Sequence, residues 1–377
     1  MIIAIASDRV YPYFKSGAEK RYWDIAQALK EEGHEVHFFT GQWPGMKEHE
    51  VYEGINLHGV YKIKNYYKKS KRSITESIIY AAALIPHLWK VNYDILDCDQ
   101  FPLGHILVAR IITLIRKKKM FVVWHEVWGK LYYKYIGIYG FLGTFFEWFI
   151  VKISPTIISA SDITAHKLIS ELQINENKIK KIGNFIDIDQ IDATPASEIK
   201  SDIIFVGRLM PHKNIKTFID VIFELSRKFP DIKGLIVGTG PEEAALHQYV
   251  YSLNITNNVM FINNASKPQQ VYALLKSAKI LLHPSEREGF GLTIAEANAA
   301  GIPAITINHQ DNASQYLIKQ GVTGYVEPHN SSLLAQRIAN LLIDSPTLSK
   351  LSKNAKKSAQ KYDWKEVKQK LFSVYFG

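Results

Sequence analysis

Residues 279–308 read KILLHPSEREGFGLTIAEANAAGIPAITIN. A short apolar run at 279–285 is followed by a glycine-containing turn, a helical pattern at 292–301 and a second apolar run at 303–308. Two short apolar runs separated by a helix are typical of a βαβ unit, whose strands are parallel and buried on both faces. The stretch therefore predicts an α/β protein built on a parallel sheet.

The same alternation of short strands and amphipathic helices continues along the chain. In the first half, strands are expected at 1–7, 35–40, 94–99, 120–126 and 156–161. In the second half, further strands are expected at 202–209, 233–240 and 259–263. This pattern predicts two Rossmann-like parallel-sheet domains that face each other across a cleft, with ligands bound at the strand ends.

The domain limits follow from length and composition. A chain of 377 residues is too long for one ordinary hydrophobic core. A polar segment without clear periodicity at 184–200 marks the expected boundary. We predict a first domain at 1–183, a second at 184–357, and a C-terminal helix at 358–377 that packs back on the first domain.

The cysteine content and the apolar segments indicate the cellular compartment in which the protein is expected. Cys98 is the single cysteine, which excludes an internal disulfide and fits a reducing cytoplasm. The first ten residues lack a basic leader, so a buried strand is expected there rather than a signal peptide. The most apolar segment, 136–153, contains Glu147 and Lys152. We therefore expect a buried or interfacial helix there rather than a membrane span.

The positive charge is concentrated in one region. The net charge is +10, and residues 61–134 contain 14 Lys and Arg against 5 Asp and Glu. One interpretation is a solvated basic face; the other is a surface that meets anionic lipid head groups or a phosphorylated acceptor. Tyrosines and tryptophans within the region favour a membrane interface over nucleic acid, and no nucleic-acid-binding motif accompanies the charge.

Glu288 and Glu296 flank the glycine turn of the opening stretch. The helix expected from Leu292 begins with unpaired amides and the positive end of its dipole, which suit a phosphate. A carboxylate accepts hydrogen bonds from sugar hydroxyls. Two acids around such a turn fit a nucleoside diphosphate sugar, although the spacing alone leaves open that both are surface acids.

Arg208 and Lys213 follow the strand expected at 202–209. Two cations on one loop can converge on a diphosphate, and they stabilise it most when it gains charge as a leaving group. The alternative is that both are solvated loop charges.

Four stretches then point to one family: GRLMPHKN at 207–214, VGTGPEE at 237–243, HPSEREGFGLTIAEANAAGIPAI at 283–305 and GVTGYVEP at 321–328. Together they resemble the retaining glycosyltransferases of family four (glycosyl transferases group 1), and residues 16–40 resemble them more loosely. The resemblance implies the GT-B fold. It also implies transfer of a hexose from a UDP- or GDP-linked sugar to a glycan or lipid-linked acceptor, in the assembly of cell-surface polysaccharide, glycolipid or lipid-linked oligosaccharide.

The resemblance also implies roles for individual residues. Glu288 would meet the donor sugar, Glu296 the ribose hydroxyls, and Arg208 with Lys213 the diphosphate. Further donor contacts are implied for Gly17, Gly238, Phe290, Gly291, Leu292 and Thr293, mainly through backbone amides. Gly238 fits a turn role equally well. Ser16 stands where the family frequently has a second glycine before Gly17.

The family also implies an acceptor side on the first domain. His125 would bind the sugar or stabilise the transition state, which would make it catalytic together with Glu288, Arg208 and Lys213. A strand-end histidine with a structural role is the alternative. Glu126 is a weaker candidate for an acceptor contact. The acceptor hydroxyl would attack from the face that the diphosphate leaves, and a phosphate oxygen would take its proton.

The resemblance implies that no metal is needed, because the Arg and Lys side chains bind the diphosphate. No separate cofactor is expected either, because the nucleotide sugar is a co-substrate. Asp97 with Asp99, and Asp187 with Asp189, look like metal-binding pairs but fall at a strand end and in the linker. Other functions remain open: a nucleotide-sugar 2-epimerase on the same fold, a non-catalytic nucleotide-sugar binder, or a basic nucleic-acid-binding protein.

Overall fold

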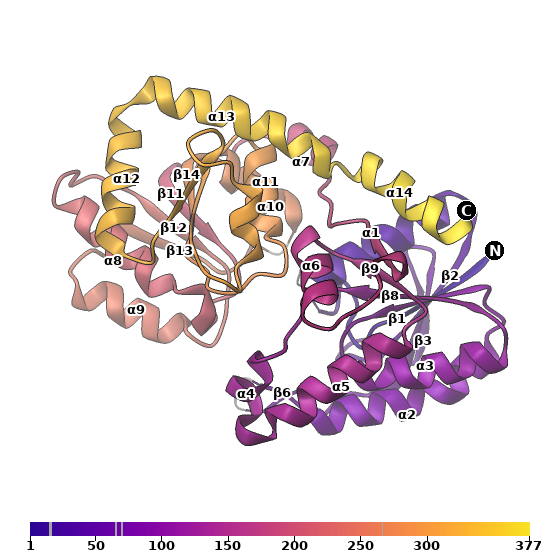
Figure 1. The fold of residues 1–377 in the computed structure, drawn as a ribbon. Coiled ribbons are helices and arrows are strands. Elements are labelled where there is room, and N and C mark those ends of the chain that lie inside the picture. The colour runs from indigo at the N-terminus through magenta and orange to yellow at the C-terminus, as the bar shows by residue number, and fades with distance from the viewer. Residues whose placement is uncertain (15–16, 65, 69–70, 266) are drawn as a thin grey trace. The chain divides into compact units, whose positions relative to one another are not determined.

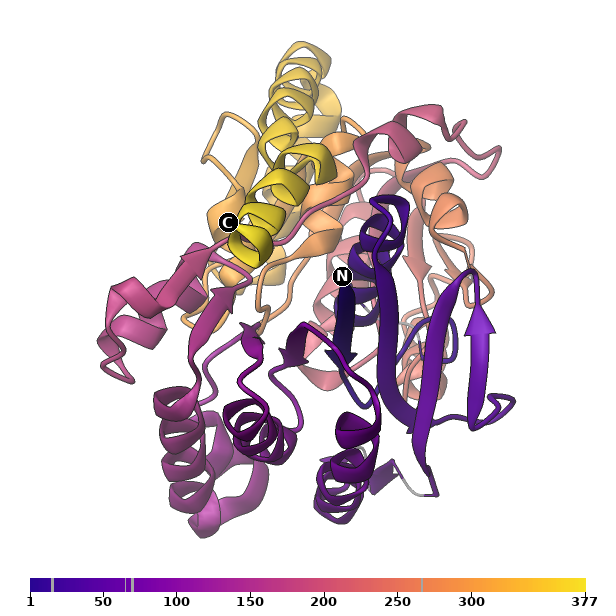
Figure 2. The same ribbon diagram turned by 90° about the vertical axis from the view of Figure 1, so that its right-hand side faces the viewer.

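The computed structural model describes the whole chain except residues 15–16, 65, 69–70 and 266. The chain divides into two compact units, the N-terminal unit (1–184 with 368–377) and the C-terminal unit (185–367). Both termini therefore lie in the N-terminal unit (Figure 2).

The predicted start of the C-terminal helix at 358 is wrong. Helix α14 spans Trp364–Phe376, and residues 358–367 group with the C-terminal unit. The reason is tertiary packing between distant parts of the chain, because the ring of Trp364 lies 4.1 Å from that of Phe185 and Asp363 forms a bridge with Ile186.

The described part of the N-terminal unit contains an eight-stranded sheet in the order β10-β9-β8-β7-β1-β2-β4-β3 (Figure 1). Its strands are β1 (Ile2–Ala6), β2 (Glu35–Gln42), β3 (His49–Tyr52), β4 (Ile55–Lys62), β7 (Ile95–Asp99), β8 (Lys119–Trp124), β9 (Thr156–Ser159) and β10 (Ile179–Lys181). All neighbouring strands are parallel except β3 and β4. The five predicted strands are confirmed; β3, β4, β10 and the small pair β5 (Tyr67–Lys68) and β6 (Lys71–Arg72) were not predicted.

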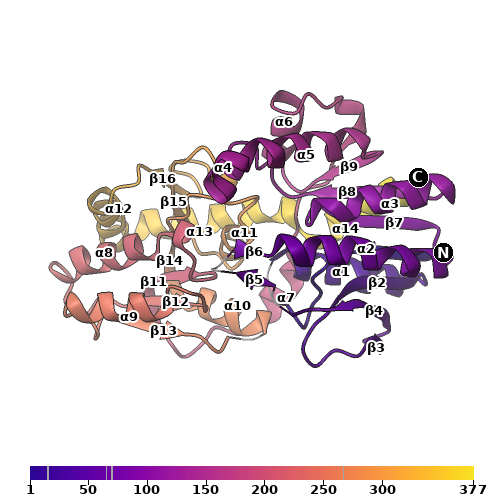
Figure 3. The ribbon, with the colours of Figure 1, turned by 90° about the horizontal axis from the view of Figure 1, so that it is seen from below.

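Helices cover both faces of this sheet. Helices α1 (Gly17–Glu31) and α14 lie on one face, while α2 (Ile74–Lys90), α3 (Leu103–Ile115) and α5 (Gly140–Ile153) lie side by side on the other (Figures 1 and 3). The short helices α4 (Leu131–Ile136) and α6 (Asp162–Ser170) complete the unit. In β7, Leu96 and Cys98 point into the core under α2 and α3, so Asp97 and Asp99 point to the opposite face.

The described part of the C-terminal unit has a six-stranded parallel sheet in the order β13-β12-β11-β14-β15-β16. Its strands are β11 (Ser201–Val206), β12 (Gly234–Val237), β13 (Val259–Ile262), β14 (Ala278–His283), β15 (Ala304–Ile307) and β16 (Gly324–Glu327). Its helices are α7 (Ile188–Ala193), α8 (Ile215–Ser226), α9 (Glu243–Ser252), α10 (Pro268–Lys276), α11 (Leu292–Ala299), α12 (Ser331–Ile343) and α13 (Ser345–Ala359). The opening stretch forms β14, α11 and β15, as predicted.

The strand order of each sheet reverses at one place. In the C-terminal unit, β11 and β14 are neighbours, and the connections that leave them diverge to opposite sides. In the N-terminal unit, β1 and β7 have the same relationship. Ligands of open parallel sheets bind at such a switch point, beyond the carboxyl ends of the strands.

Candidate active site

The switch point of the C-terminal unit brings the two predicted halves of the donor site together. The loop after β11 carries Arg208 and, in a short 3-10 helix (Pro211–Lys213), Lys213. The loop after β14 carries Glu288. The two loops are joined by backbone, because the Glu286 N–H donates to the His212 carbonyl at 2.9 Å.

Lys213 and a histidine both bind Glu288. The Lys213 Nζ donates to Glu288 Oε1 at 2.5 Å, and His283 Nε2 lies 2.6 Å from the same oxygen. An ionised carboxylate only accepts hydrogen bonds, so His283 Nε2 carries the proton. His283 was not predicted as a site residue, although it is the last residue of β14 and directly precedes the loop that carries Glu288.

Glu288 is held ionised. Burial opposes ionisation, but attraction to Lys213 and then to His283 holds the pKa of Glu288 well below its usual range. Burial also lowers the pKa of His283, which is 1% exposed at its side chain. The cluster is therefore a lysine cation and a neutral histidine around one carboxylate.

The backbone of Glu288 is fixed by a third loop. Its N–H donates to the Asp311 carbonyl at 3.0 Å, and its carbonyl accepts from Ala313 N–H at 2.9 Å. The loop is itself held by Asn312, whose side-chain amide donates to the Ile307 carbonyl at 2.8 Å. Glu288 is thus positioned by loops that follow three adjacent strands.

Positive potential surrounds the cluster. Burial, then the charges of Arg287, Lys213 and Arg208, lowers the pKa of His212 to about 3. Three cations therefore lie close enough to His212 to raise the positive potential at this loop, which suits an anion such as a diphosphate. Arg287 lies beside Glu288 in the sequence but was not predicted as a site residue.

The turn before α11 requires its glycine. Gly291 has φ 104°, and a Cβ there would lie 2.3 Å from the Ser314 Cβ. The first amides of α11, from Leu292 and Thr293, have no partner within the helix, as at any helix start. The side chain of Phe290 is buried and packs edge-on against Tyr362, so it is not available to a ligand.

Two further predicted donor residues, Glu296 and Gly238, already have close neighbours within the C-terminal unit. The Tyr272 hydroxyl donates to Glu296 Oε1 at 3.4 Å. Gly238 has φ 139°, and a Cβ there would lie 2.0 Å from the Gly207 carbonyl oxygen. Close packing of the loops after β11 and β12 therefore already explains a glycine at position 238.

At the switch point of the N-terminal unit, His125 pairs with an aspartate. His125 Nε2 lies 3.1 Å from Asp99 Oδ1, and Ser7 Oγ donates to Asp99 Oδ2 at 2.9 Å. Burial opposes ionisation of Asp99, but its hydrogen bond to His125 and the charges of His125 and Arg9 hold its pKa well below the usual range. Asp99, set aside above as a false metal motif, therefore anchors the His125 ring.

The backbone after β8 is fixed by one side chain. Gln100 Oε1 accepts from the N–H groups of His125 and Glu126 at 2.9 and 3.1 Å, and Gln100 Nε2 donates to the Glu126 carbonyl at 2.6 Å. The Glu126 side chain accepts from Trp128 Nε1 at 2.7 Å. Gly17 is exposed at the first residue of α1, and Ser16 lies outside the described residues.

A buried charge cluster lies beside this pair. Arg9 Nε lies 2.8 Å from Glu19 Oε1, and Arg72 pairs with Asp8. Within the described residues, no three His, Cys, Asp or Glu side chains are arranged to hold a metal ion. The absence of a metal requirement stays a prediction.

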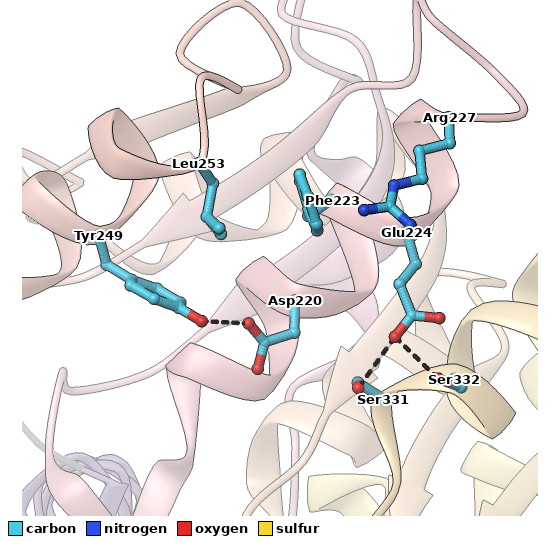
Figure 4. Close-up of a pocket in the computed structure, with 8 residues that line it drawn as sticks. All are labelled: Asp220, Phe223, Glu224, Arg227, Tyr249, Leu253, Ser331 and Ser332. Carbon is cyan, nitrogen blue, oxygen red and sulfur yellow. Dashed lines mark hydrogen bonds between the residues drawn. The ribbon is translucent and has the colours of Figure 1, made fainter.

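A separate surface pocket of about 500 Å³ is formed by α8, α9 and the start of α12 (Figure 4). Tyr249 donates to Asp220 at 2.6 Å, and Glu224 accepts from Ser331 and Ser332. None of the predicted site residues lines this pocket.

The chain matches two families over almost its full length. Residues 187–358 match the family described as Glycosyl transferases group 1, and residues 15–190 match Glycosyltransferase Family 4. The chain is similar to the N-acetyl-alpha-D-glucosaminyl L-malate synthase of Bacillus anthracis, with 25% identity over 374 residues that cover 94% of this chain and 92% of that protein.

Solved structures agree with these matches. The Anabaena protein HepE, in complex with UDP and glucose, has a TM-score of 0.76 at 19% identity and covers 100% of this chain and 99% of its own. WaaG, a glycosyltransferase involved in lipopolysaccharide biosynthesis, has a TM-score of 0.77 at 16% identity, with 100% of both chains covered. The two parallel-sheet units and these matches show that the chain belongs to the group 1 glycosyltransferases of family four and has the GT-B fold.

Proposed function

We propose that the protein transfers a hexose, with retention of configuration, from a UDP- or GDP-linked sugar to a glycan or lipid-linked acceptor. The observation that carries this proposal is the cluster of Lys213, Glu288 and His283 at the switch point, beside the start of α11. It combines a cation for the diphosphate with an ionised acid for sugar hydroxyls.

The donor is bound by the C-terminal unit. Arg208 and Lys213 hold the diphosphate; Lys213 has three N–H donors, and its bond to Glu288 uses one of them. Both bonds to Glu288 end at Oε1, and the described residues show no bond to Oε2, which is therefore suited to a hydroxyl of the donor sugar. Because the diphosphate gains charge as it leaves, the cations lower the barrier to its departure.

The acceptor is bound mainly by the N-terminal unit. His125, held by Asp99, binds the sugar or stabilises the transition state. The acceptor hydroxyl attacks from the face that the diphosphate leaves, and a phosphate oxygen takes its proton. Glu126 is the weaker candidate for an acceptor contact. No separate base and no metal are required by this route.

The relatives support the classes of donor and acceptor. HepE was solved with UDP and glucose, and WaaG acts in lipopolysaccharide biosynthesis. We place the protein in the cytoplasm, in cell-surface polysaccharide, glycolipid or lipid-linked oligosaccharide assembly; the part of WaaG in lipopolysaccharide biosynthesis supports this kind of role.

The test has two steps. A thermal-shift panel of nucleotide sugars identifies the donor, because a ligand stabilises by RT ln(1 + [L]/Kd). The preferred donor is then incubated with acceptors, and the anomeric configuration of the product is determined by NMR. A glycoside with the donor's configuration supports the proposal. An inverted product contradicts retention, and a free epimer or no turnover contradicts transfer.

A further inference from the structure

The outer helices of the N-terminal unit expose many large apolar side chains. Helices α2, α3 and α5 lie side by side on one face of the sheet (Figure 3). On α2, Ile74, Ile78, Ile85 and Trp89 are all exposed. At 100° per residue these positions form a single stripe along the helix, and that stripe faces away from the protein.

Helix α5 has the same character. Phe141, Phe145 and Trp148, spaced i, i+4 and i+7, are exposed, while Ile150 and Val151 are buried in the core. The prediction that the segment 136–153 is a buried helix is therefore wrong, and the alternative, an interfacial helix, stays a prediction. Within this segment, helix α5 has one face in the core and a wide apolar face exposed.

This apolar face carries no exposed acid. All residues from 74 to 153 are described, and α2, α3, α4 and α5 contain only two acids, Glu76 and Glu147. Glu76 is 6% exposed and Glu147 is fully buried, where its two oxygens accept from the N–H groups of Trp128 and Gly129 at 2.9 and 2.8 Å.

Cations surround the face. Lys90 ends α2, Lys117 follows α3, and Lys130 and Lys134 lie around α4; all four are exposed. Lys152, near the end of α5, lies 5.9 Å from the Trp148 ring centre. Aromatic and apolar side chains bordered by lysines match the interface of an anionic bilayer.

We propose that this face, formed by α2, α3, α4 and α5, binds the surface of an anionic lipid membrane. A second copy of the chain is a poorer occupant, because self-association through this face would place lysines against lysines. Membrane binding by this face does not depend on the reaction proposed above. It extends the basic region predicted at 61–134 with the apolar helix α5, which the charge pattern does not reveal.

The helices lie on the membrane rather than cross it. The segment Leu131–Ile153 is long and apolar enough to span a bilayer. It is not one straight helix, because the chain reverses at Gly137, which has φ 64°, and α4 packs back on α5. A Cβ at Gly140 would lie 2.6 Å from the Tyr133 backbone. Glu147 further ties α5 to the loop after β8.

Vesicle flotation of the full chain tests this proposal. Phosphatidylcholine vesicles with and without phosphatidylglycerol serve as probes, at low and high salt. We expect flotation with the anionic vesicles at low salt and weaker binding at high salt, because salt screens the lysines. Absence of flotation with anionic vesicles, or a wild-type protein that resists extraction at alkaline pH as a spanning protein does, would overturn it.

Two matched substitutions distinguish vesicle binding through this face from nonspecific hydrophobic binding. Phe145 on α5 and Ile343 on α12 of the C-terminal unit are each 61% exposed. We expect Phe145→Glu to weaken binding about tenfold, because an apolar anchor becomes an anion, and Ile343→Glu to leave it unchanged. Equal binding by both variants would contradict the assignment.

Folding and self-association are checked in the same set. Ile78→Glu, at an exposed position of α2, is a second variant should Phe145→Glu have a lowered melting temperature. It is expected to weaken binding in the same way. A wild-type dimer that dissociates in either variant, without any vesicle binding, would assign the face to a second copy instead.

Discussion

Lys213 and Glu288 are 75 residues apart in the sequence, and the Lys213 Nζ donates to Glu288 Oε1 at 2.5 Å. The contact exists because β11 and β14 are neighbours in the sheet, so the loops that follow them meet at one edge. It joins the residue expected to bind the diphosphate to the residue expected to bind the sugar.

Glu288→Ala is expected to lower kcat/KM about 10²-fold or more, the loss typical of a missing transition-state contact. The protein should stay folded, because the loop backbone is held by Asp311 and Ala313. Circular dichroism and donor turnover measure the two effects. Glu286→Ala, at a half-buried acid of the same loop, is the control, and near-normal turnover of Glu288→Ala would remove its proposed role.

Lys213→Met is expected to change the pH profile as well as the rate. The pKa of Glu288 is depressed chiefly by Lys213, so loss of that cation raises it. Glu288 acts as an anion, and the acidic limb of kcat/KM should therefore move to higher pH. Steady-state kinetics from pH 4 to 8 measure the shift, with Lys216→Met, an exposed lysine of α8, as control. An unmoved acidic limb would contradict the pairing.

Asp99→Asn should lower kcat about tenfold, because the His125 ring loses the carboxylate that orients it. If Asp99 acts through His125, the two substitutions are not additive. Asp99→Asn should then cause little further loss in a His125→Ala background. A double-mutant cycle on kcat measures this, and independent, additive losses would assign Asp99 to structure alone.

The stability of the N-terminal unit should fall as pH rises from about 4 to 7. Burial raises the pKa of Asp97 to about 7 from 3.8, and its carboxyl is bonded to the Tyr375 hydroxyl. Because the protonated carboxyl is favoured in the folded protein, Asp97 stabilises the fold fully at pH values below its unfolded-state pKa of 3.8. This stabilisation is lost as the pH rises through the folded-state pKa of about 7. The loss is at most about 4 kcal/mol for this one group.

Calorimetry of the wild type and Asp97→Asn at several pH values measures this effect. The variant, which cannot ionise at this position, should show a flatter dependence of melting temperature on pH. Asp231→Asn, at an exposed acid, should keep the wild-type slope. Parallel curves for the wild type and Asp97→Asn would show that Asp97 is not the group responsible.

Local sequence pattern was enough to predict most of the fold. Most central strands of the two sheets are short apolar runs buried on both faces, so their composition indicates them directly. Strand β7 is the exception, because it carries Asp97 and Asp99. Edge strand β3 alternates exposed and half-buried residues and was not predicted. The predicted start of the C-terminal helix lies before the observed one. The contact of Trp364 with Phe185 joins distant parts of the chain, so the local sequence does not indicate it.

The sequence by itself determined the two tandem parallel-sheet domains, the glycine turn before α11, and the residue types of the donor site, because these depend on periodicity and on neighbours along the chain. Only the tertiary structure decided that His283 and Lys213 bind one oxygen of Glu288, that Asp99 holds His125, and that α5 exposes a broad apolar face. Those features arise from strand order and helix packing, which bring together residues far apart in the chain, so no local sequence pattern indicates them.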